Sequence, residues 1–71
     1  MYIVIEMQTD ASGNVSIPAP ASYANINDAE AKFHTILAAA AQSSVPIHSA
    51  IIVDNEACLI RNERYIHNGE E

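Results

Sequence analysis

Several features that stabilise small proteins are scarce in this chain of 71 residues, which has one cysteine, no tryptophan and one phenylalanine. The single cysteine, Cys58, excludes an internal disulfide and is typical of a reducing cytosol. A chain this short buries only ~60 % of its unfolded surface and is marginal alone. Self-association is the remaining source of stability, so we expect a homodimer or a dimer of dimers.

Positive charge is also scarce, because three Lys and Arg residues stand against nine Asp and Glu residues, a formal net charge of −6. This balance argues against direct nucleic-acid binding, which needs clustered cations, and against a basic amphipathic membrane binder. The longest apolar run, residues 36–41, is far shorter than the ~20 residues that span a bilayer. No basic export signal precedes the first apolar residues, so we expect a cytoplasmic protein.

The hydrophobic pattern predicts two hairpins around one helix. Strands are expected over residues 2–8, 15–17, 47–53 and 58–67, with turns at 10–14 and 54–57 and an ordered connector at 18–26. Pro18 and Pro20 cannot donate ladder hydrogen bonds, so the second strand should lie at a sheet edge. The order predicts an α+β fold of ββαββ type, a four-stranded antiparallel sheet with one helix packed on one face. We expect residues 1–67 to form one domain and residues 68–71 a flexible tail.

The helix is expected over residues 29–42, with Asn27 as its N-cap and Glu30 as the reciprocal capping partner. One arc should face the sheet and contains Ala29, Phe33, Ile36, Leu37 and Ala40. The opposite side is small and almost uncharged, and contains Ala31, His34, Thr35, Ala38, Ala41 and Gln42. Because exposed apolar patches tend to mark interaction sites, we expect this side to be the oligomer interface. The alternative is that alanine supplies helix propensity on a solvated side. The sheet face away from the helix should also be partly apolar, through Tyr2, Val4, Ile52 and Leu59.

The candidate ligand-binding residues are His48, Arg61, Arg64, Tyr65, His67 and Tyr23. Leu59, Arg61, Glu63, Tyr65 and His67 alternate onto one face of the last strand, ~7 Å apart, while Arg64 should point to the other face. His48 joins the set if the register permits. Arginine binds phosphate or carboxylate through two parallel hydrogen bonds, tyrosine can stack on a planar ring, and histidine can donate or accept a hydrogen bond. The set therefore fits a small anionic, nucleotide-like ligand. The alternative is an ordinary solvated sheet face with cross-strand pairs.

Metal and catalytic patterns are not evident in the sequence. The spacing of His34, His48 and His67 matches no zinc pattern, and we assign no metal, cofactor or catalytic residue. The serines lack a nucleophile-elbow pattern and the chain has no glycine-rich phosphate loop. We therefore expect a protein that is not an enzyme, the alternative being a small hydrolase or isomerase that uses Cys58 or a histidine.

Three segments carry a resemblance to other proteins: residues 29–41 (AEAKFHTILAAAA), residues 45–50 (VPIHSA) and residues 64–67 (RYIH). The chain resembles a group of small uncharacterised phage and prophage proteins of gut Firmicutes with the same hairpin, helix and hairpin order. The resemblance implies an accessory protein in the cytoplasm of a bacterial host. We expect a non-enzymatic counter-defence factor that sequesters a nucleotide-like immune signal at an oligomer interface. The alternatives are an inhibitor that binds a host nuclease or other defence protein, and a structural accessory protein.

Overall fold

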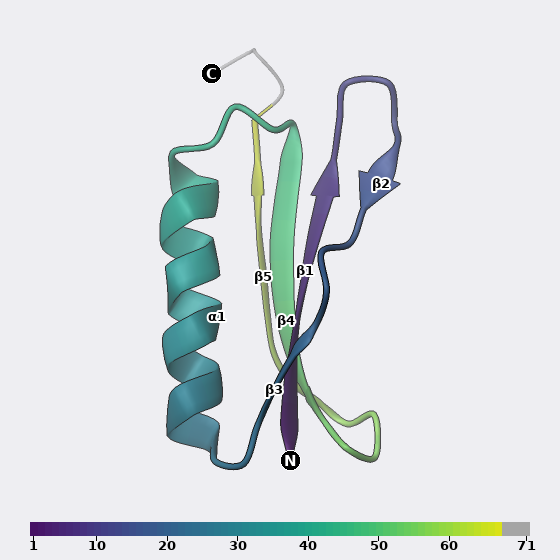
Figure 1. Ribbon diagram of the computed structural model, residues 1–71. Helices are drawn as coiled ribbons and strands as arrows, with labels where there is room; N and C mark the ends of the chain where they lie inside the picture. Colours follow the sequence, from purple (N-terminus) through teal and green to yellow (C-terminus); the bar gives the residue numbers. More distant parts are fainter. Residues whose placement is uncertain (68–71) are drawn as a thin grey trace.

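The computed structural model describes residues 1–67, so the tail expected at residues 68–71 lies outside the described residues. The elements in chain order are β1 (Tyr2–Thr9), β2 (Val15–Ser16), β3 (Ala21–Tyr23), α1 (Ile26–Ala41), β4 (Ile47–Asp54) and β5 (Leu59–Ile66). All strand pairs are antiparallel, in the order β2-β1-β4-β5, and β3 also pairs with β1. The helix lies along one side of this sheet (Figure 1). The predicted α+β class, with one helix packed on an antiparallel sheet, is confirmed.

The sheet has five strands instead of the expected four, because the connector at 18–26 contains β3. The prolines end β2 after two residues, and the chain then returns to the same edge of β1, where Tyr23 pairs with Tyr2 and Ala21 with Val4. The return places the Tyr23 side chain against the core. The predicted edge position of β2 is confirmed, since its one strand partner in the described residues is β1.

The expected helix cap was wrong, because the N-cap lies two residues earlier and the helix begins at Ile26. Asn25 is the N-cap: its backbone is extended (φ −127°, ψ 158°), and its side-chain oxygen accepts from the backbone N–H of Asp28 at 2.9 Å. The Asn25 amide in turn donates to the Asp28 carboxylate at 3.1 Å. This reciprocal pair replaces the expected one between Asn27 and Glu30. The early start brings Ile26 into the first turn, where it packs on the core.

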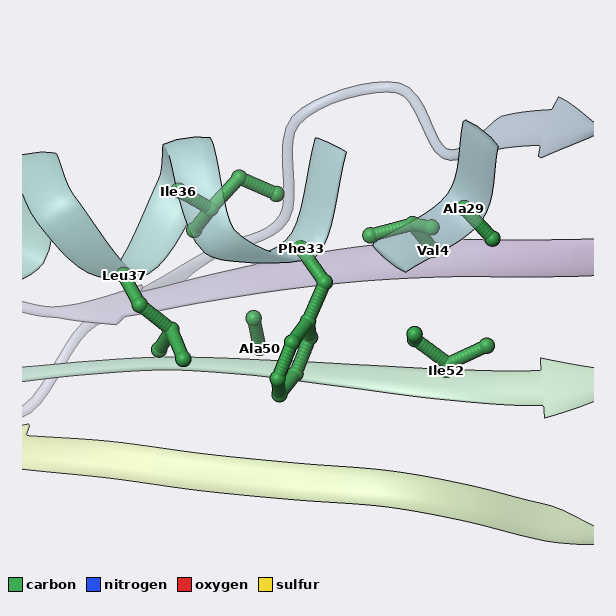
Figure 2. Packing of buried hydrophobic residues seen from close by; sticks show 7 residues of the cluster. All are labelled: Val4, Ala29, Phe33, Ile36, Leu37, Ala50 and Ile52. Carbon is green, nitrogen blue, oxygen red and sulfur yellow. The ribbon is translucent and has the colours of Figure 1, made fainter. Parts of the chain in front are cut away.

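The core lies between the helix and the sheet, as Figure 2 shows. The helix contributes the arc predicted from its spacing, and the structure buries all five of those residues. Val4 of β1 and Ala50 and Ile52 of β4 meet them from the sheet. Ile52 is fully buried, at 0 % exposure. Since alternate residues of a strand point to opposite faces, the burial of these three fixes which face of each strand lies under the helix.

The face of the sheet turned away from the helix is here called the open face. It carries Ile3, Ile5, Met7 and Thr9 of β1, Ile47, Ser49, Ile51 and Val53 of β4, and Leu59, Asn62, Arg64 and Ile66 of β5. Tyr2, Val4 and Ile52 were expected on this face, and that expectation was wrong because all three pack in or against the core. Among the described residues, no other element covers the open face (Figure 1).

A β-bulge near the start of β5 moves one predicted residue to the other face. The register shifts between Ile52, which pairs with Arg61, and Val53, which pairs with Leu59. The extra residue, Ile60, packs against the core. Leu59 therefore lies on the open face, 54 % exposed, instead of sharing a face with Arg61 as strict alternation predicts.

Candidate functional site

The polar strip predicted on the last strand exists, but it lies on the side of the sheet that the helix covers. The register places His48 opposite Tyr65, Glu63 opposite the buried Ala50, and Arg61 opposite the buried Ile52. Cross-strand partners share a face, so His48, Arg61, Glu63 and Tyr65 all point to the helix side. We call these residues, together with His67, the helix-side strip.

Several members of the helix-side strip are already engaged with the helix. The Nε of Arg61 donates to the Glu30 carboxylate at 2.7 Å, which ties β5 to the first turns of α1. Nε2 of His67 lies 2.9 Å from the carbonyl oxygen of Ala40. A carbonyl only accepts, so this histidine nitrogen carries the proton. The His67 ring also stacks on Tyr65, with centroids 6.3 Å apart and planes at 9°. The strip therefore fastens the helix to the edge of the sheet.

His48 is the most buried polar residue of the strip, at 4 % exposure. Its Nε2 lies 2.5 Å from a carboxylate oxygen of Glu6, which also accepts from the Gln8 amide at 2.9 Å. Burial raises the pKa of Glu6, but the hydrogen bonds from His48 and Gln8 and the nearby positive charges outweigh it, so the pKa falls below its usual value. The second ring nitrogen of His48, Nδ1, is buried and has no hydrogen-bond partner among the described residues.

The electrostatics of the helix-side strip do not favour an anionic ligand. Glu30 holds the Nε of Arg61, and Glu6 holds His48. Glu63 adds a further carboxylate to the same face. An anion arriving here would meet three carboxylates for one arginine, and would have to displace Glu30 to use the whole guanidinium fork.

The structure does not bring the two remaining ligand candidates to the strip. Tyr23 lies in β3, at the opposite edge of the sheet from β5. Arg64 pairs with Ser49 and lies on the open face, as the alternation predicted. A single site formed by all six expected residues is therefore excluded within one copy of the described chain.

The sequence predicted a partly apolar open face, but of the four residues assigned to it only Leu59 lies there. The exposed apolar side chains of this face include Met7 at 37 %, Ile47 at 38 %, Leu59 at 54 % and Ile66 at 45 %. Ile3, Ile5, Ile51 and Val53 lie between them and are half-buried by their neighbours. The signal was present in the run Ile51-Ile52-Val53, because a strand that is apolar on both faces is typical of a sheet covered on both sides.

Residues of β4 and β5 line a hollow of about 500 Å³, and four of the six have their side chains on the open face. The six residues are Ser49, Ala50, Ile51, Asn62, Glu63 and Arg64. By strand alternation the side chains on this face are those of Ser49, Ile51, Asn62 and Arg64, while the other two residues present their backbone. The hollow therefore combines a guanidinium, an amide and a hydroxyl with one apolar side chain.

The outer side of the helix is exposed, as the oligomer-interface prediction requires, and it contains Ala31, His34, Thr35, Ala38, Ala41 and Gln42. Some of its polar groups are satisfied locally: the Thr35 hydroxyl donates to the Ala31 carbonyl at 2.9 Å, and Nε2 of His34 lies 3.3 Å from Glu30. Its role in self-association stays a prediction.

The comparisons found no matching family model, no matching curated protein and no matching solved structure. Among the described residues, no helix combines the length and the apolar character needed to cross a membrane. Within residues 1–67, no three His, Cys, Asp or Glu side chains gather where they could hold a metal ion. Two surfaces of the described residues are candidates for interaction, the open face and the outer side of the helix.

Proposed function

We propose that this protein acts by stoichiometric binding, and that its working form is a homodimer joined through the open face. The observation that carries the proposal is the composition of that face: apolar residues of β1, β4 and β5 lie side by side with no covering element in the described chain. Large exposed apolar patches on soluble proteins mark interaction surfaces. A second copy of the same face would make the fold a four-layer arrangement, helix, sheet, sheet, helix.

The size of the open face supports a second copy as its occupant. Three strands of eight residues and the β2/β3 edge, at ~4.8 Å between strands and ~3.4 Å per residue, cover roughly 500 Å² per copy. Two copies then bury roughly 1,000 Å², the size at which specific interfaces begin. The twofold arrangement is self-complementary, since each copy presents the same patch.

The distribution of charge supports the same occupant. The net charge of −6 opposes the approach of two copies. Every described acidic residue lies in the helix, in a turn or on the helix side of the sheet, and none lies on the open face. Two copies that meet through the open face therefore keep their carboxylates apart. The outer side of the helix, in contrast, lies next to Asp28 and Glu30.

Analytical ultracentrifugation with two single-residue variants tests the proposal. We expect the wild-type protein to dimerise with increasing concentration. Ile51→Glu places a charge in the centre of the open face and should give a monomer that keeps its circular dichroism spectrum. Ala38→Glu is the matched control, because it places the same charge on the outer side of the helix. Dimerisation that survives Ile51→Glu and fails with Ala38→Glu would assign the interface to the helix and overturn the proposal.

The expected counter-defence role, sequestration of a nucleotide-like immune signal, stays a prediction. The structure separates its six expected residues and leaves Arg64 as the member that lies on the proposed interface. A ligand held at a dimer interface would therefore be sought around Arg64, before the helix-side strip. The alternative in which the open face binds a defence protein instead of a second copy predicts a monomer in the same ultracentrifugation experiment.

A further inference from the structure

We propose that the hollow around Arg64 binds a small anion, the phosphate or carboxylate group of an organic ligand, and that the anion strengthens the dimer. The inference rests on the proposed function, because the second copy closes the hollow. It assigns the anion chemistry to the open face instead of the helix-side strip.

Arg64 and Arg61 are three residues apart in the same strand, yet their surroundings differ. Arg61 is paired with Glu30 at 2.7 Å. Arg64 makes no ion pair within 4 Å in the described structure, and its whole guanidinium fork remains free. Planar guanidinium groups bind carboxylate and phosphate through two parallel hydrogen bonds. Of the two arginines, Arg64 is therefore the one that can bind an external anion without breaking an existing contact.

The residues beside Arg64 supply the rest of a recognition site. Ser49 lies directly across from Arg64, and Asn62 lies two residues away on the same face, at ~7 Å along the strand. The hydroxyl and amide donate hydrogen bonds to oxyanions, and Ile51 gives an apolar wall opposite Asn62. The volume, about 500 Å³, is within the ~300–1,000 Å³ range of ligand pockets. The space therefore fits an anion that carries an organic group.

Dimerisation favours a bound anion beside Arg64. A second sheet laid on the open face removes water from Arg64, and the described residues place no carboxylate on that face to replace it. Burying an unpaired guanidinium is costly, whereas a guanidinium paired with an anion and hydrogen-bonded is tolerated. Binding and dimerisation are therefore linked, and each should strengthen the other by the same factor.

The negative charge of Glu63 should weaken anion binding at Arg64, so a Glu63 variant gives a second test of the site. The Glu63 backbone lines the hollow, and its carboxylate accepts from the backbone N–H of Arg64 at 3.0 Å, at the edge of the sheet. The Glu63 side chain lies on the other face, but its negative charge is on the residue next to Arg64 and weakens anion binding there through like-charge repulsion. Glu63→Gln should therefore increase the affinity for an anion.

The experiment measures the dimer dissociation constant by ultracentrifugation in inorganic phosphate, in acetate and in sodium chloride of equal ionic strength. The chloride arm is needed because salt alone screens the repulsion between two acidic copies. When the phosphate concentration is ten times the dissociation constant of phosphate from the dimer, each occupied site should lower the dimer dissociation constant about tenfold. The phosphate and acetate arms separate the two anion chemistries.

Two arginine variants decide the result. Arg64→Gln should dimerise more tightly than the wild type in chloride, because no unpaired guanidinium is buried, and should lose the gain from either anion. Arg61→Gln should retain that gain. A wild-type dimer that gains nothing from phosphate or acetate would overturn this inference and leave the proposed function intact. If both arginine variants lose the tightening by phosphate or acetate to the same extent, the inference is also overturned, because the effect of the anions would then reflect the net charge of the protein. A wild-type monomer under all conditions would overturn the proposed function and the linkage with it.

Discussion

Neighbouring residues 51 and 52 offer a direct test of the two faces of the sheet. Ile52 is fully buried under the helix, whereas Ile51 lies on the open face, half-buried in a single copy. Truncation of a fully buried isoleucine to alanine costs ~2–5 kcal/mol. A chain of this length has a total stability of roughly 4–11 kcal/mol, at ~0.05–0.15 kcal/mol per residue. Ile52→Ala should therefore remove a large part of it, and lower the melting temperature by at least ~10 °C.

The matched change Ile51→Ala should cost less folding stability and should also weaken assembly. At most about a third of the Ile51 side chain is in water in one copy, so the loss of folding stability is about 1.6 kcal/mol. In the dimer each copy buries the remainder, at most ~0.8 kcal/mol per copy or ~1.6 kcal/mol per dimer, which weakens dimerisation up to about 15-fold. Thermal unfolding of dilute protein and sedimentation equilibrium measure the two quantities separately. If Ile51→Ala lowers the melting temperature of dilute protein as much as Ile52→Ala does, the assignment of faces is wrong.

Three further predictions concern stability. Because its pKa is lowered, the Glu6 carboxylate stabilises the fold above its usual pKa of 4.5 and loses that contribution as the pH falls; Glu6→Gln should flatten this part of an acid titration followed by circular dichroism. Asn25→Ala should cost ~1 kcal/mol in urea unfolding, whereas Asn27→Ala, outside the cap contact, should change stability by less than ~0.5 kcal/mol. Ala57 has φ 65°, so Ala57→Gly should raise stability by up to ~1 kcal/mol, and a loss would contradict strain at this turn.

The secondary structure was predictable wherever the pattern of residues was local. The helix arc from Ala29 to Ala40 repeats every three to four residues, and the structure buries it as expected. The turn after β1 uses the Asp10 side chain, which accepts from two backbone N–H groups at 2.9 Å. Such local hydrogen bonding favours turns in any context. These elements need no information from the rest of the chain.

The features that the sequence did not predict correctly depend on tertiary contacts. In β1 the alternating set that starts at Ile3 is more apolar than the set that starts at Tyr2, which contains Glu6 and Gln8. The pattern therefore favoured the wrong set for the helix side, since Val4 is the residue that packs in the core. The three residues of β3 become a strand because the edge of β1 is free beside them. For the same reason, the period of β5 placed Arg61 on a face but could not give its partner, since Glu30 lies 31 positions away in the sequence. The apolar character of the open face was predicted, but the residues of β1 and β4 were assigned to the wrong sides of the sheet.

The strand order has a consequence for biosynthesis. The two hairpins of the sheet are local, but its central pair joins β1 to β4, and Glu6 contacts His48 across 42 positions. A ribosome that adds ~5–20 residues per second leaves β1 without this partner for roughly 2–8 seconds. The entropy cost of closing this long loop comes before the β1–β4 pair gives any stabilisation. Folding should therefore be slower than that of a helical bundle of equal length. During this interval the apolar residues of β1 are accessible to chaperones, so the nascent chain is most prone to aggregate before β4 has emerged.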